Sequence, residues 1–167
     1  MSSHAVRIFG IDPGLNRCGW GVIVSEGSRL SFVAHGVVTP DPKLSLAQRL
    51  GEIFEGLCAQ IEIHRPDEVA VEETFVNTNA RSALALGQAR GAAMVAAAMA
   101  RLPVGEYPPA TIKKAVVGSG QADKTQIAYM IKRLLPACEG ASADAADALA
   151  VAICHAAHAG LRKRTGG

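Results

Sequence analysis

Three apolar runs at the start of the chain alternate with turn signals. They cover residues 6–11, 18–24 and 30–38, and the turns that follow them are Asp-Pro-Gly, Ser-Glu-Gly-Ser and Thr-Pro-Asp-Pro. Apolar runs of this length between turn residues are typical of β-strands. Because the connections are short, we expect the three strands to pair as an antiparallel meander.

The period then changes to that of a helix. Apolar side chains recur at spacings of four and three residues, at Leu46, Leu50, Ile53, Leu57 and Ile61. This spacing places them on one face of an amphipathic helix, which we assign to residues 45–64. Pro66 ends the helix, because proline disfavours helical backbone at the residue before it.

The rest of the chain alternates between the two kinds of element. A buried strand, a long helix of small residues and a short strand are predicted at 68–71, 80–100 and 103–107, and three more helices at 111–116, 124–135 and 143–159. This order predicts an α/β protein with a five-stranded mixed sheet and helices on both faces. No repeat or low-complexity linker interrupts it, so we expect one domain over residues 1–160 and a basic, flexible tail at 161–167.

Composition narrows the class of protein. The chain has 167 residues, of which 49% are hydrophobic, and a formal net charge of +2. These values fit one folded domain, and the charge alone does not indicate a nucleic-acid-binding protein. The longest run of small apolar residues, 91–100, is half of the roughly twenty that a membrane span needs. We therefore expect no membrane span, no signal peptide and a cytoplasmic location. The four cysteines match no zinc-binding spacing.

Four carboxylates lie in apolar surroundings. Asp12 follows the apolar run 8–11, Glu72 follows the run 69–71, and Asp144 and Asp147 are three residues apart on one helix face. A buried carboxylate is costly unless it is paired or binds a metal, and converging acids repel one another. Oxygen ligands suit Mg²⁺ or Mn²⁺, and two such ions can promote phosphodiester cleavage.

Each acid also has a simpler explanation. Asp12 is compatible with a turn, Asp144 with stabilisation of a helix N-terminus, and Glu72 with a solvent-facing strand end beside Glu73. Asp147 fits such explanations least, because the helix that follows it is apolar nearly all round. The residue pattern alone does not choose between Glu72 and Glu73.

Four segments together resemble the RuvC family of Holliday junction resolvases, over residues 7–158. They are FGIDPGLNRCGWGVI, AVEETFVNTNARSALALGQARG, VVGSGQADKTQI and ADAADALAVAICHA. The resemblance implies an RNase H-like fold and a homodimeric crossover junction endodeoxyribonuclease. Such an enzyme makes paired nicks in strands of like polarity at four-way DNA junctions during recombination and repair. It also implies Mg²⁺, replaceable by Mn²⁺, with two ions in each active site, and a branch-migration helicase complex as a partner.

The same resemblance assigns roles to individual residues. It implies catalytic and metal-binding roles for four acids, Asp12, Glu72, Asp144 and Asp147, and DNA contacts for Phe75, Lys113 and Lys124. Phe75 matches the aromatic residue that family members insert at the junction, where it can stack on unpaired bases. Without the resemblance, we would interpret this phenylalanine as a core residue and the two lysines as solvated.

Other interpretations stay open at this point. Residues 10–14 also resemble the first phosphate loop of actin-like ATPases and sugar kinases, although those proteins need two lobes and a longer chain. A ribosomal-RNA-processing nuclease of related fold is another alternative, as is a non-catalytic module, which the four acids disfavour. Cys154, His155 and His158 have helical spacing for a shared metal but no evident fourth ligand, and the basic triplet 162–164 suits either DNA contact or solubility.

Overall fold

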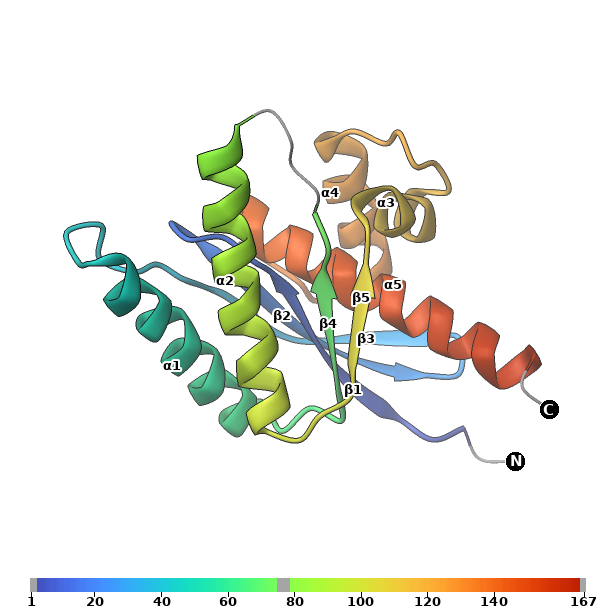
Figure 1. Ribbon diagram of the computed structural model, residues 1–167. Coiled ribbons are helices and arrows are strands. Elements are labelled where there is room, and N and C mark those ends of the chain that lie inside the picture. The colour runs from blue at the N-terminus through green and yellow to red at the C-terminus, as the bar shows by residue number, and fades with distance from the viewer. Residues whose placement is uncertain (1–2, 75–78, 166–167) are drawn as a thin grey trace.

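The computed structural model describes residues 3–74 and 79–165, which build a five-stranded sheet between two layers of helices (Figure 1). The sheet order is β3-β2-β1-β4-β5. Its strands are β1 (Val6–Asp12), β2 (Cys18–Glu26), β3 (Arg29–Val38), β4 (Glu68–Glu72) and β5 (Val104–Tyr107). The first three strands are antiparallel, whereas β4 runs parallel to β1 and β5 runs parallel to β4. The predicted meander and the mixed sheet are therefore confirmed.

Helices cover both faces of the sheet, as predicted. They are α1 (Leu46–His64), α2 (Ala80–Met99), α3 (Pro109–Val117), α4 (Lys124–Leu134) and α5 (Ala143–Thr165). One core lies between the sheet and the pair α1 and α2, and a second core joins the sheet to α3, α4 and α5. In Figure 1, α5 runs obliquely across the sheet on the face opposite α1 and α2.

The ends of the first helix follow from local chemistry. The side chain of Ser45 accepts a hydrogen bond from the backbone N–H of Gln48, and the Gln48 side chain bonds back to the Ser45 backbone. This reciprocal pair satisfies donors that a helix start leaves free. The helix ends at Arg65, whose φ of 46° is left-handed, directly before Pro66. The predicted stop is therefore confirmed.

The helix α5 lies unusually close to the sheet. A Cβ atom at Gly10 would overlap the backbone oxygen of Ala148, and one at Gly19 would overlap that of Asp144. At Gly21 an added Cβ would lie 2.6 Å from a methyl carbon of Leu149. Three glycines on β1 and β2 thus leave the room that the first turns of α5 occupy.

A buried polar contact fixes the middle of the same helix. His155 of α5 is 3% exposed; its Nδ1 atom lies 2.8 Å from the Tyr107 hydroxyl, and its Nε2 atom bonds the Glu68 carboxylate. The second histidine, His158, contacts the backbone oxygen of Cys154 at 2.9 Å. His155 therefore links α5 to β5 and to the start of β4. Both of its ring nitrogens have protein partners, so its role in this structure is a structural one and not that of a metal ligand.

The predicted boundaries differ from the structure by one or two residues at several elements and by six at the end of the last helix. The last helix was expected to end at Ala159, but α5 continues to Thr165. Gly160 alone does not stop a helix, no proline follows it, and basic residues in a last turn are favoured by the helix dipole. The backbone of residues 161–165 is therefore helical, while the flexibility of the tail stays a prediction. Within the described part of the chain, no helix is both long enough and apolar enough to cross a membrane.

The close approach of α5 makes a prediction for Gly10→Ala. The added methyl group has to displace helix backbone, and overpacking of this kind costs about 1–3 kcal/mol. Urea unfolding measures the change. The matched control is Gly51→Ala in α1, where an added Cβ meets open space; alanine there is expected to stabilise the protein by about 0.5–1 kcal/mol. Equal stability for the two variants would contradict the tight packing of α5.

Candidate active site

The predicted acids come from three elements that meet at one end of the sheet. Asp12 and Glu72 are the last residues of β1 and β4, which pair in parallel with Ile11 opposite Val71. The carboxyl ends of neighbouring parallel strands lie at the same sheet edge. The first turns of α5 bring Asp144 and Asp147 to that edge, because α5 packs on β1 and β2 there.

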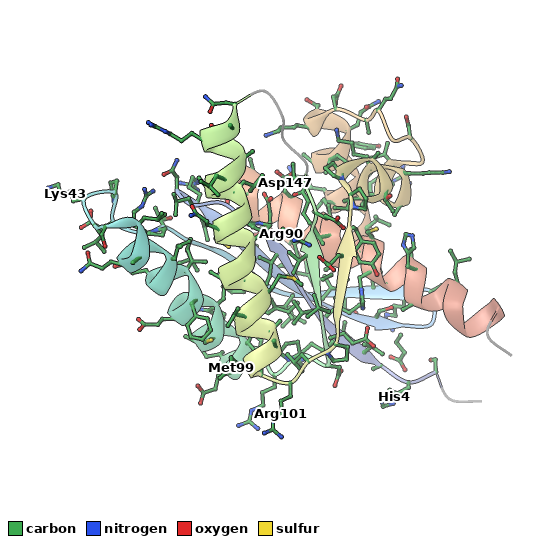
Figure 2. All side chains as sticks on the ribbon, viewed as in Figure 1. His4, Lys43, Arg90, Met99, Arg101 and Asp147 are labelled. Atoms are coloured by element: carbon green, nitrogen blue, oxygen red, sulfur yellow. The ribbon has the colours of Figure 1, made fainter. Side chains whose placement is uncertain are left out.

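A cleft opens at this edge, with a volume of ≈ 580 Å³. Figure 2 shows Asp147 on α5, between α2 and the pair α3 and α4. Polar residues in the wall come from five stretches of the chain: Asp12, Glu72, Thr74, Lys113, Asp123, Lys124 and Asp147. The apolar part of the wall includes Leu86 of α2 and Ile112 of α3. Five of the seven predicted site residues therefore share one cleft, and Asp144 lies beside it.

The acids in the cleft are unfavourably placed for negative charge. Burial is the main reason that the pKa of Asp12 rises from 3.8 to about 9, and a side-chain hydrogen bond with Glu72 and the charges of Glu72, Asp147 and Asp144 raise it further. Burial likewise raises the pKa of Asp147 to about 6. A site with these properties attracts a cation, because a positive ion removes the repulsion between the acids.

Two lysines partly offset this negative charge. Lys124 and, more weakly, Lys113 act to lower the pKa of Asp147 against the effect of burial. Lys113 is on α3 and Lys124 is the first residue of α4, so both reach the cleft from the side opposite α2. Asp123 caps α4 by accepting a hydrogen bond from the backbone of Gln126 at 2.8 Å, which fixes the start of the helix that carries Lys124.

Asp144 has a different partner from the other acids. Its Oδ2 atom accepts a hydrogen bond from Nε of Arg17 at 2.6 Å. Arg17 lies in the loop between β1 and β2, and Asn16 of the same loop accepts a hydrogen bond from Arg49 of α1 at 2.5 Å. Within the described residues, no three Asp, Glu, His or Cys side chains lie close enough together to hold a metal ion as they are placed.

The structure distinguishes the two adjacent glutamates. Glu72 lies in the cleft and interacts with Asp12, whereas Glu73 does not line the cleft. The Glu73 backbone N–H donates to the backbone oxygen of Tyr107 at 2.8 Å, which continues the pairing of β4 with β5. The alternation of side chains along a strand explains the difference, because neighbouring residues point to opposite faces.

Some predicted residues lie outside the part of the chain that the structure describes, and one residue beside the cleft was missed. Phe75 lies outside the described residues, as do the side chains of the basic triplet 162–164. Arg17 was missed because its partner is 127 positions away in the chain. Its position shortly after the Asp-Pro-Gly turn was the available signal, but no spacing in the sequence points from that turn to Asp144.

Comparisons with known proteins point to one family. A family model described as "Crossover junction endodeoxyribonuclease RuvC" matches residues 8–155. The chain is similar to two proteins with that same description. The protein of Caulobacter sp. (strain K31) is 62% identical over 90% of this chain and 89% of its own length. The protein of Hyphomonas neptunium (strain ATCC 15444) is 54% identical over 98% of each chain.

Solved structures are similar as well. The structure described as "T. thermophilus RuvC in complex with Holliday junction substrate" has a TM-score of 0.87 and 35% identity, and the match covers 93% of this chain and 96% of that one. The yeast mitochondrial Holliday junction resolvase Ydc2 has a TM-score of 0.65 over 95% of this chain and 83% of that one, and its 11% identity shows a common fold alone.

The buried acid at the end of β1 makes a prediction for Asp12→Asn. Asp12, with a pKa of about 9 in the folded protein, has to take up a proton on folding, whereas asparagine is neutral in both states. In EDTA at neutral pH, the variant is therefore expected to be more stable than the native protein by about 1 kcal/mol. This corresponds to a rise in Tm of about 2–4 °C. Exposed Glu55 provides the control, and Glu55→Gln should leave Tm unchanged. A lower Tm for Asp12→Asn would contradict the repulsion within the cleft.

Proposed function

The chain belongs to the RuvC family of crossover junction endodeoxyribonucleases, and we propose on this premise that the cleft at the ends of β1 and β4 is its active site. The protein has the RNase H-like fold and is a nuclease that resolves Holliday junctions. The observation that carries the site assignment is the meeting of Asp12, Glu72 and Asp147 in one cleft with two lysines. The alternatives, an RNA-processing nuclease and an actin-like or sugar-kinase ATPase, are not favoured.

The donor set of the cleft fits a hard divalent cation, on which nucleases of this family depend. All four acids offer carboxylate oxygens. Burial and, to a smaller extent, the neighbouring acids raise the pKa values of Asp12 and Asp147, and a cation would favour their charged forms. Asp12, Glu72, Asp144 and Asp147 would hold the metal, which we take to be Mg²⁺, replaceable by Mn²⁺, with two ions in each site. When bound, such ions activate water and stabilise charge on phosphate oxygens.

The protein's own residues then position the DNA strand. Lys113 and Lys124 face the acids across the cleft and supply positive charge for the phosphates of that strand. The acids of the cleft are half-buried while Lys124 is exposed, so the attraction is strongest on the side of Lys113, where water is partly excluded. The lysines therefore counter the repulsion between the acids and the DNA backbone, and they hold the scissile phosphate against the carboxylates.

Paired nicks require two active sites in a symmetric arrangement, which a homodimer provides on a four-way junction. One face of α2 supports this assembly. Leu84, Val95 and Met99 are 62%, 50% and 70% exposed on this helix, and Gly87 and Gly91 lie between them at helical spacing with open space above each. A smooth apolar strip of this kind suits close contact with the same strip of a second copy.

Two further elements of the proposal rest on family membership alone. They are a role for Phe75 at the opened junction and association with a branch-migration helicase complex. A cytoplasmic location, and one domain over residues 1–160 with a basic tail, are proposed from the sequence pattern.

A synthetic mobile four-way junction tests the function. With Mg²⁺ the protein should nick it symmetrically in strands of like polarity, and EDTA should abolish cutting. Asp12→Asn and Glu72→Gln are expected to keep junction binding and to lower the cleavage rate more than about 100-fold, the scale of losing one electrostatic stabiliser. Glu73→Gln is the matched control and should cut normally. Near-normal cleavage by Asp12→Asn would refute the assigned site.

The dimer is tested separately by placing a charge on the exposed strip. Val95→Glu is expected to shift the protein from dimer to monomer in sedimentation equilibrium, because the charge would be buried between two copies. Ala59→Glu, at an exposed position on α1, is the control and should stay dimeric. If Val95→Glu sediments as the native protein does, this face of α2 is not the interface.

A further inference from the structure

The pair of Arg17 and Asp144 joins a loop residue to one of the proposed metal ligands. The two side chains meet at 2.6 Å, and they are 52% and 32% exposed. Asp144 is the one acid of the four that does not line the cleft. Its charge nevertheless contributes to the raised pKa values of Asp12 and Asp147, so it lies within electrostatic range of them.

The loop that carries Arg17 is held in place by α1 and by a tight turn of its own. Arg49 of α1 donates hydrogen bonds to the Asn16 side chain at 2.5 Å and to the Leu15 backbone oxygen at 3.4 Å. A Cβ at Gly14 would overlap the backbone oxygen of Arg17, so the turn is tight. The position of Arg17 beside α5 is therefore built into the fold.

We propose that Arg17 is a positioning residue that holds Asp144 beside the cleft until a DNA phosphate engages the guanidinium. The inference rests on the proposed function and deepens it. Asp144 cannot both pair with Arg17 and turn fully toward Asp12, Glu72 and Asp147. Release of this ion pair adds a fourth carboxylate to the donor set, so the affinity for the metal rises when DNA is bound.

A phosphate is the partner that fits Arg17. Guanidinium groups bind phosphate oxygens through two parallel hydrogen bonds, and half of this side chain is open to solvent. Its contact with Asp144 is an exposed ion pair, a kind of pair that contributes little free energy in water. A phosphate of the bound strand can therefore replace the carboxylate at small cost. By linkage, the same coupling makes the metal favour DNA binding.

The test is a double-mutant cycle on Mn²⁺ affinity, measured by electron paramagnetic resonance on the intact protein without DNA. Arg17→Ala is expected to bind Mn²⁺ about two- to five-fold more tightly than the native protein, the factor that an exposed ion pair is worth. Lys114→Ala, which removes an equal charge from an exposed position on α3, is the control for general charge. In an Asp144→Asn background, Arg17→Ala should change the Mn²⁺ affinity no more than this control does. Arg17→Lys, which keeps the charge and a hydrogen-bond donor, should restore affinity toward the native value.

Each outcome decides the matter. If Arg17→Ala also increases the Mn²⁺ affinity in the Asp144→Asn background, Arg17 acts through its general charge. If Arg17→Ala lowers the Mn²⁺ affinity, Arg17 orients Asp144 toward the metal. Either result overturns the proposal. A four-way junction that cannot be cleaved then tests the coupling between DNA binding and metal binding. Its addition should increase the Mn²⁺ affinity more in the native protein than in Arg17→Ala. The cycle needs no cleavage, so its failure is distinct from failure of the proposed nuclease function.

Discussion

The close packing of α5 on the sheet is the constraint on which the rest of the molecule depends. Glycines on β1 and β2 let the helix backbone lie directly against the strands at Asp144 and Ala148. Farther along, Gly105 of β5 leaves room for His155, which bonds Tyr107 and Glu68. Because the helix is fixed against the sheet from Asp144 to His155, its first two turns can deliver two acids to the ends of strands that are distant in sequence.

The same packing creates an electrostatic cost that the fold does not remove by itself. Asp12 and Asp147 are drawn into a half-buried cleft where burial raises both pKa values, and the two lysines compensate only in part. Such arrangements are common at functional sites, where stability is lost in favour of chemistry. A cation that binds between the acids would relieve their repulsion, and this relief would contribute to its affinity.

Much of the fold and the set of candidate acids could be predicted from the sequence, for identifiable physical reasons. The change from strand period to helix period, together with turn residues, located every strand and helix, and the apolar contexts of Asp12 and Asp147 marked them as unusual. The choice of Glu72 over Glu73 needed either the family resemblance or the strand register. The pairing of Arg17 with Asp144 could not be predicted, since it joins residues 127 positions apart through tertiary packing. The end of α5 was missed because a single glycine near a helix terminus does not reveal whether the helix continues.

The shortness of β4 has a consequence for how this fold can vary. Glu68 at its start bonds a histidine of α5, Glu72 at its end lies in the cleft, and Ala70 between them packs in the core shared with α5. Val69 and Val71 face the core of α1 and α2 instead. Insertion or deletion of one residue within this strand would reverse that alternation, placing an acid in an apolar core and a valine in the cleft. The four-residue spacing between Glu68 and Glu72 thus fixes the length of β4. Insertions that the protein tolerates should therefore occur in its loops and not in this strand.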